Sequence, residues 1–109
     1  MKLPAPGEIV IHDYRPKEPI EPNESLKVLQ WNIERNYESE TIIKTIKDLD
    51  PDVIILQEID IGCKRSGGYD HMQELCMTLE LKGGFVCEFE ELDSPIRKLR
   101  DAGGGVHAV

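Results

Sequence analysis

Two polar side chains, Asn32 and Glu58, follow apolar runs of strand length and are of types that bind divalent cations or phosphate. The first run, Leu26–Ile33, carries Asn32 near its end, and the second, Val53–Leu56, is followed two residues later by Glu58. A helix-length segment, Glu40–Leu49, separates the two runs. A strand–helix–strand unit gives parallel neighbouring strands, and ligands bind such sheets beyond the carboxyl ends of the strands. We therefore expect Asn32 and Glu58 at the same edge of a sheet, one strand apart.

The chemistry that this pair would support is magnesium-dependent reaction at phosphorus. Mg²⁺ prefers hard oxygen ligands and is usually held by one or two carboxylates, with substrate phosphate and water at its other positions. Glu58 as a metal ligand and Asn32 as the group that orients water or a phosphate oxygen would provide half of such a site. The spacing leaves one alternative open, in which both side chains end their strands and bond only to local backbone.

Charged residues after the second apolar run add to the candidate site. Arg65 and Lys64 lie in the following loop, where an arginine would bind substrate phosphate through two parallel hydrogen bonds; a solvated loop is the alternative. Asp60 would hydrogen-bond to metal-bound water. His107 lies among glycines and is interpreted as incidental rather than as a catalytic base, and the acidic run Glu88–Asp93 as a solvated strand edge.

The apolar pattern predicts the elements that position these residues. The segment Glu40–Leu49 spaces its apolar residues as one helix face, with Ser39 as the expected N-cap and Asp50-Pro51 as the end. Asp70 is the expected N-cap of a second helix, which glycine at Lys82–Gly84 ends. The other predicted segments are an edge strand within Glu8–Tyr14, a strand at Leu26–Ile33 that is buried on both faces, a strand at Val53–Leu56, a loop over Ile59–Gly68, a half-exposed strand over Gly84–Leu92 and the start of a strand in Ala102–Val109.

The order of these segments predicts an α/β fold with a leader. Five prolines within the first 25 residues, at positions 4, 6, 16, 19 and 22, predict an extended leader over residues 1–25. Residues 26–109 follow the order strand, helix, strand, helix, strand, which predicts one domain.

Composition narrows the class of protein. The 109 residues are 39% hydrophobic and 31% charged, which is typical of a globular chain. A net charge of −8 argues against binding nucleic acid through a cationic surface but allows an enzyme that holds phosphate through a metal. The sequence contains no apolar run of about 18 residues and no secretory signal, so we expect no membrane span. Cys63, Cys76 and Cys87 have no CxxC spacing, which predicts buried reduced thiols, no disulfides and an intracellular protein, cytoplasmic or nuclear.

The segments LQWNI and DPDVIILQEID resemble the opening of the endonuclease/exonuclease/phosphatase family, which includes DNase I-like nucleases, deadenylases, inositol-phosphate phosphatases and sphingomyelinases. In that family the Asn of a WN or FN pair and the Glu of a QE pair belong to the divalent-metal and phosphate site, and they match Asn32 and Glu58. CKRSGGYD and GGGVHAV also look like members with a GGG-x-H-G-N-A-I-L-S element, although Ala108 stands at a glycine of that pattern. The resemblance covers about Leu26 to Val109. It implies a Mg²⁺- or Mn²⁺-dependent hydrolase of phosphodiester or phosphomonoester bonds, with nucleic acid among the candidate substrates.

The family's later catalytic segments have no counterpart here. An Asp-x-Asn segment and a Ser-Asp-His segment are missing, and His12, His71 and His107 match none of those positions. The resemblance therefore implies the amino-terminal part of a DNase I-like α/β sandwich, inactive alone and with one unmatched sheet face. The alternative is a truncated, non-catalytic interaction module whose exposed sheet face pairs with another chain.

Overall fold

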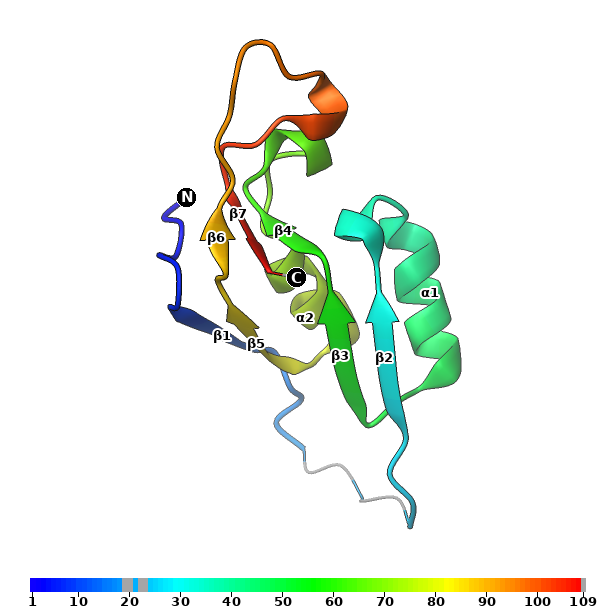
Figure 1. Ribbon diagram of the computed structural model, residues 1–109. Coiled ribbons are helices and arrows are strands. Elements are labelled where there is room, and N and C mark those ends of the chain that lie inside the picture. The colour runs from blue at the N-terminus through cyan, green and yellow to red at the C-terminus, as the bar shows by residue number, and fades with distance from the viewer. Residues whose placement is uncertain (19–20, 22–23, 109) are drawn as a thin grey trace.

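The computed structural model describes residues 1–18, 21 and 24–108, which form a mixed α/β fold (Figure 1). The strands are β1 (Ile9–Asp13), β2 (Val28–Asn32), β3 (Val53–Gln57), β4 (Ile59–Ile61), β5 (Lys82–Val86), β6 (Phe89–Glu90) and β7 (Val106–Ala108). The helices are α1 (Ser39–Leu49) and α2 (His71–Leu79), and the 3-10 turns are η1 (Glu34–Asn36), η2 (Lys64–Ser66) and η3 (Leu99–Asp101). The predicted α/β class and the order β2–α1–β3–α2–β5 are confirmed.

The strands form three small sheets. β2 and β3 pair in parallel, as the strand–helix–strand reading predicts, and β1 pairs antiparallel with β5. In the third sheet β7 lies between β4 and β6 and is antiparallel to both. The predicted edge strand within residues 8–14 is thus confirmed as β1, which joins part of the expected leader to the domain.

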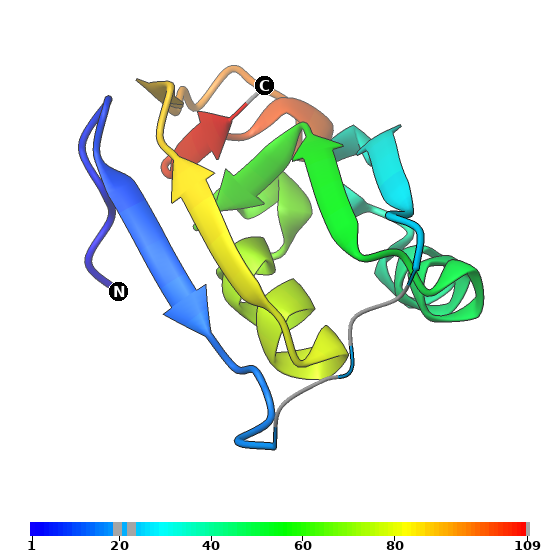
Figure 2. The same ribbon diagram turned by 90° about the horizontal axis from the view of Figure 1, so that it is seen from below.

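Both helices pack on one side of the strands (Figure 2), and the core lies between them. Its buried members include Ile42 and Ile46 from α1, Met72, Leu75 and Cys76 from α2, Ile59 and Ile61 from β4, and Phe85 from β5. Helix-facing residues of the parallel pair pack against this core, among them Trp31 and Leu56. The cysteines are buried free thiols, as predicted.

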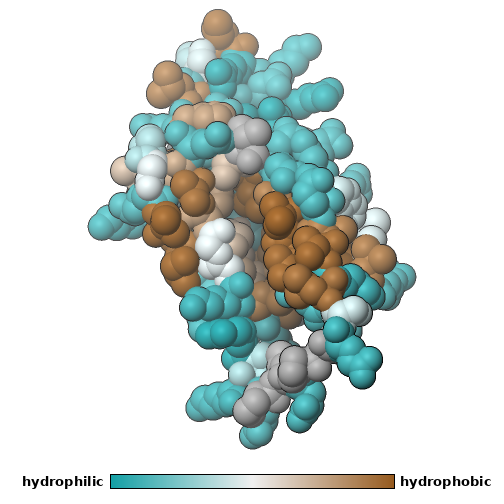
Figure 3. Space-filling model, turned by 60° about the horizontal axis from the view of Figure 1, so that its bottom comes forward, coloured by the Kyte–Doolittle hydropathy of each residue, from teal (hydrophilic) through white to brown (hydrophobic). Residues whose placement is uncertain are grey.

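The opposite face of the strands is uncovered, so the prediction that residues 26–33 are buried on both faces is wrong. Val28 is 52% exposed on β2, and Val53 and Ile55 are 41% and 50% exposed on β3. Ile9, Ile11 and Val86 on β1 and β5 are likewise exposed. Apolar side chains gather in two groups with a hollow between them in Figure 3. Helices cover only one side of the described strands, which leaves this face apolar and open.

Two of the predicted helix ends agree with the structure. The side chain of Asp70 accepts a 2.9 Å hydrogen bond from the amide of Gln73, which confirms it as the N-cap of α2. Asp50 ends α1 in a left-handed conformation. Ser39 is not the predicted cap, because its hydroxyl donates instead to Glu74, 3.2 Å away.

Three other boundaries differ from expectation. Glu80, rather than glycine, takes the left-handed position after α2, and Lys82–Val86 pairs as β5. The predicted loop over Ile59–Gly68 contains β4 and η2, because Ile59 and Ile61 pair with β7. The strand expected over residues 84–92 is divided into β5 and β6, which pair with different neighbours. No helix in the described part of the chain is long and apolar enough to cross a membrane.

Candidate functional site

Asn32 and Glu58 lie at the same edge of the parallel pair. Asn32, the last residue of β2, is opposite Gln57, the last residue of β3, and Glu58 is the next residue along the chain. The amide of Ile33 donates to the carbonyl of Gln57 at 3.1 Å, and the amide of Arg35 donates to the carbonyl of Glu58 at 2.9 Å. The parallel register therefore brings the two predicted residues together at the carboxyl ends of neighbouring strands.

The backbone at this edge adopts conformations that side chains rarely take. Glu34, Arg35 and Asn36 of η1 have φ angles of 49°, 60° and 61°, and Glu58 has a φ of 60°. Residues other than glycine in the left-handed region cost roughly 1–3 kcal/mol each, and they gather at functional sites. The two other described non-glycine residues of this kind end helices, where the conformation is common. The strain is therefore concentrated beside Asn32 and Glu58.

The side chain of Asn32 is exposed and has one local bond. Its Oδ1 accepts a 3.1 Å hydrogen bond from the amide of Glu34, which helps to hold the η1 turn. This contact matches the alternative in which Asn32 bonds local backbone. Glu58 is partly exposed.

A cation at this edge would have few protein ligands. The described residues contain no group of three or more histidine, cysteine or acidic side chains that could hold a metal. Mg²⁺ and Mn²⁺ tolerate such a donor set, since Mg²⁺ keeps several waters and takes one or two carboxylates from the protein. Glu58 with the amide oxygen of Asn32 fits this hard-oxygen half-site, and it does not fit zinc, which takes three or four protein ligands. A buried acceptor without a partner, Oδ1 of Asn36, lies in the same turn.

Behind the edge, β4 carries a buried ionic cluster centred on Asp60, which is fully buried. Arg65 donates to its two carboxylate oxygens through Nε and Nη2, both at 2.9 Å. Ser66 Oγ donates at 2.7 Å, and Nδ1 of His107 donates at 2.6 Å. Arg65 also donates to Glu91 at 2.7 Å. The cluster therefore joins β4, η2, β7 and the segment after β6.

Burial and hydrogen bonding act in opposite directions on these charges. Burial alone would raise the pKa of Asp60, but hydrogen bonds from Arg65, His107 and Ser66 outweigh it and hold the pKa well below its ordinary value. The hydrogen bonds that Arg65 donates to Asp60 and Glu91 raise the pKa of Arg65. Asp60 and Arg65 are thus a fully charged pair inside the domain.

Arg65 and Lys64 both pair with acidic side chains of this chain, Arg65 buried and Lys64 on the surface. The side chain of Arg65 is 3% exposed and pairs with Asp60 and Glu91. Lys64 pairs with Asp93. These contacts give both cations partners within the chain, and the prediction that Arg65 binds substrate stays a prediction. They also show that the acidic run includes two ion-pair partners and is not only a solvated edge.

A second hydrogen-bond chain connects the strained turn to this cluster. Asn36 is 2% exposed, and its Nδ2 lies 3.0 Å from Nδ1 of His71. Nε2 of His71 lies 2.7 Å from the carbonyl oxygen of Ser66. Because a carbonyl only accepts, Nε2 carries the proton and Nδ1 accepts from Asn36. The edge is thereby linked through His71 and Ser66 to Asp60.

Sequence reasoning missed these connections. His107 was expected to be incidental, yet it is 5% exposed and bonded to Asp60. Asp60 itself is surrounded by protein donors, and its expected role toward metal-bound water stays a prediction. One usable signal was the alternation of Ile59, Asp60 and Ile61, which is a strand pattern that places a carboxylate between two buried residues.

Comparison with known proteins finds no similar protein. The chain matches no family model, no curated protein and no solved structure.

Proposed function

We propose that this chain is the amino-terminal part of a DNase I-like α/β phosphoesterase domain, whose β2–β3 edge holds Mg²⁺ or Mn²⁺ beside substrate phosphate. One observation carries the proposal: Asn32 and Glu58 are close along the paired backbones at the carboxyl ends of parallel strands, where the left-handed non-glycine residues concentrate. Oxygen-rich side chains at such an edge are typical of ligand sites in α/β sheets.

Each residue at the edge has a distinct role in this proposal. The Glu58 carboxylate holds the cation, and Asn32 orients a water or a phosphate oxygen. When bound, the cation supplies positive charge that stabilises the phosphoryl oxygens. Arg35 is half-buried in the strained turn and donates through Nη1 to the hydroxyl of Tyr37 at 3.1 Å. Its remaining guanidinium donors suit a phosphate oxygen better than those of Arg65, which are directed at Asp60 and Glu91.

The substrate class is a phosphodiester or phosphomonoester. The net charge of −8 disfavours tight, sequence-independent binding to long polyanions such as nucleic acid. We expect the 109 residues to bind the cation weakly and to hydrolyse little or nothing alone, because the described residues contain no cluster of three or more metal-holding side chains at the edge.

Mn²⁺ provides a test that does not depend on turnover. Bound Mn²⁺ broadens nearby amide signals in NMR spectra, and we expect selective broadening of Ile33 and Gln57. Glu58→Gln should abolish it while leaving the fold unchanged. Glu80→Gln is the matched control, because Glu80 is also a glutamate with positive φ, 55°, but ends α2. Equal broadening in Glu58→Gln and in the unmutated chain would rule out the proposed site.

A non-catalytic interaction module is the second candidate, and the uncovered sheet face supports it. Ile9, Ile11, Val28, Val53 and Ile55 are each at least 41% exposed on that face. Exposed apolar surfaces of this kind often mark protein interfaces. Sedimentation across a range of concentrations distinguishes the candidates: self-association that Ile55→Lys abolishes supports the module, and a monomer at all concentrations removes this support.

A further inference from the structure

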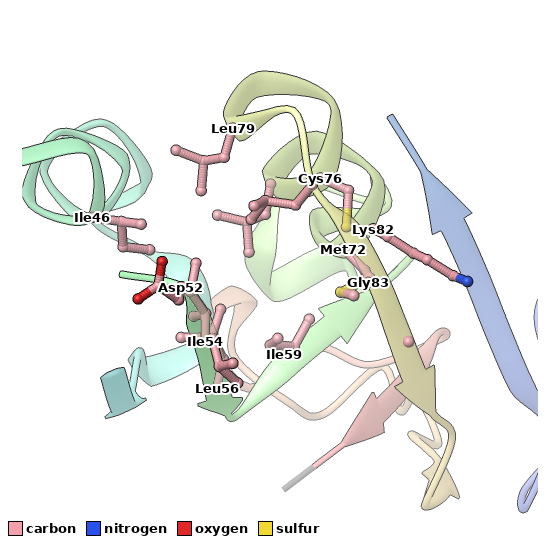
Figure 4. Close-up of a pocket in the computed structure, with 14 residues that line it drawn as sticks. Ile46, Asp52, Ile54, Leu56, Ile59, Met72, Cys76, Leu79, Lys82 and Gly83 are labelled. Atoms are coloured by element: carbon pink, nitrogen blue, oxygen red, sulfur yellow. The ribbon is translucent and has the colours of Figure 1, made fainter. Parts of the chain in front are cut away.

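A cavity of about 330 Å³ lies between β3 and β5 (Figure 4). Ile54, Leu56 and Ile59 line one side, and Gly83 lies on the other. Met72 and other residues of α2 form part of its wall, and Ile46 of α1 closes another part. The space is therefore an apolar groove bordered by two strands and backed by both helices.

Each bordering strand turns an unpaired edge toward this groove. Among the described residues β3 pairs only with β2, and β5 pairs only with β1. The amide of Val53 donates to the carbonyl of Lys27 at 3.2 Å, and the carbonyl of Gln57 accepts from the amide of Ile33 at 3.1 Å. Both groups of β3 are thus directed toward β2. Because backbone groups of successive strand residues point to opposite sides, those of Ile54 and Leu56 point away from β2. Unpaired edges of this kind are templates for a further strand.

The groove continues the line of a strand that is already present. β7 lies between β4 and β6 and is antiparallel to both. β4 follows β3 after a single residue, Glu58, and β6 follows β5 after only two residues. The space between β3 and β5 therefore continues the position that β7 occupies between β4 and β6, as Figure 1 shows.

We propose that this groove accepts one extended strand, which runs on in line with β7, antiparallel to β3 and β5. The strand would bond to the edge groups of Ile54 and Leu56 and join the two-stranded sheets into one sheet of five strands. Every second side chain would enter the groove, so the occupant has apolar residues at alternate positions. A pair of strands alone is only marginally stable, whereas a continuous sheet that packs on helices is stable. The inference is independent of the proposed phosphoesterase function.

Tails joined to the carboxyl terminus test this proposal. Three six-residue tails are compared: alternating threonine and valine, the same residues in the opposite phase, and glycine–serine. We expect one alternating phase to raise Tm by several degrees and to slow hydrogen exchange at the Ile54 and Leu56 amides by at least about tenfold. Val53 and Ile55 amides, which face β2, should change little. The opposite phase and the glycine–serine tail should have no such effect.

Three outcomes would overturn the proposal. The first is that neither alternating tail protects Ile54 and Leu56 more than the glycine–serine tail does. The second is equal stabilisation by both phases, which would indicate general apolar adhesion. The third is protection that appears only with self-association in sedimentation, which would assign the groove to a second copy of the chain.

Discussion

Replacing Asp60 by asparagine tests whether the buried cluster holds the fold together. The substitution keeps the shape of the side chain and removes its charge. Asp60 accepts hydrogen bonds from Arg65, Ser66 and His107, and Asp60→Asn places an amide group against some of those donors. The guanidinium of Arg65, 3% exposed, would then keep only Glu91 as its charged partner.

The expected loss of stability is large for a chain of this size. Removing one partner of a buried ion pair costs about 3–5 kcal/mol when the other charge stays buried, and here Glu91 compensates only part of the Arg65 charge, so we expect a loss near the lower end of that range. Domains of this kind have unfolding free energies of about 5–15 kcal/mol in total. At about 4–8 °C per kcal/mol, Tm should fall by roughly 12 °C or more. Ser66→Ala removes only one donor to the charged carboxylate and should cost about 1.5–3 kcal/mol.

Urea unfolding followed by Trp31 fluorescence and by circular dichroism measures these changes. Asp48→Asn is the control, since Asp48 forms an exposed pair with Lys44 at 3.0 Å. It should cost only about 0.3–0.5 kcal/mol. A loss below about 1 kcal/mol for Asp60→Asn would refute the assignment of a structural ion pair. If Asp60→Asn does not fold, the loss of stability measured for Ser66→Ala provides the test instead.

The pH dependence provides an independent check on the same residue. The pKa of Asp60 is lowered in the folded state, whereas an unfolded aspartate has a pKa of about 3.9. The stabilisation is therefore complete above the unfolded pKa and is lost as pH falls through 4 toward the folded pKa. The difference in unfolding free energy between the unmutated chain and Asp60→Asn should shrink as pH falls from 5 to 2. A constant difference would contradict the argument.

Two further predictions concern α2 and the thiols. A Cβ at Gly83 would lie 2.5 Å from Sγ of the buried Cys76 and 2.3 Å from the terminal methyl carbon of Met72, so Gly83→Ala should destabilise by about 1–3 kcal/mol in urea unfolding. Gly84→Ala, whose Cβ would lie 3.3 Å from the exposed Ile11, is the matched control and should change little. Burial raises the pKa of Cys63 to about 11, so a disulfide reagent at pH 8 should label this thiol rapidly only after unfolding, and rapid labelling of the folded chain would contradict its burial.

Local patterns were sufficient to predict the unit that carries the candidate site. The apolar spacing of α1 and the β-branched run Val53–Ile55 are contained within a few residues, and a short crossover fixes the parallel direction. The adjacency of Asn32 and Glu58 followed from that direction alone. Burial of the second strand face did not follow, because the apolar content of a strand does not show what covers it.

The buried cluster could not be predicted because it depends on long-range pairing. Arg65 is five residues from Asp60, but Glu91 is 26 residues from Arg65 and His107 is 47 residues from Asp60. Only the antiparallel pairing of β4 with β7 brings His107 opposite Asp60. The glycines between Ile59 and Gly68 indicated a loop, so the short strand β4, which makes this pairing, was not predicted.

The strained edge and the buried cluster are parts of one arrangement. Four left-handed residues at the edge cost roughly 1–3 kcal/mol each, so neighbouring contacts must hold them in place. Asp60 fixes β4 two residues after Glu58, and Asn36 is held through His71 to Ser66 of the same cluster. The cluster therefore fixes the backbone on both sides of the candidate cation position. A site with so few protein ligands needs that rigidity, because an edge free to relax would no longer hold Asn32 and Glu58 on neighbouring strand ends.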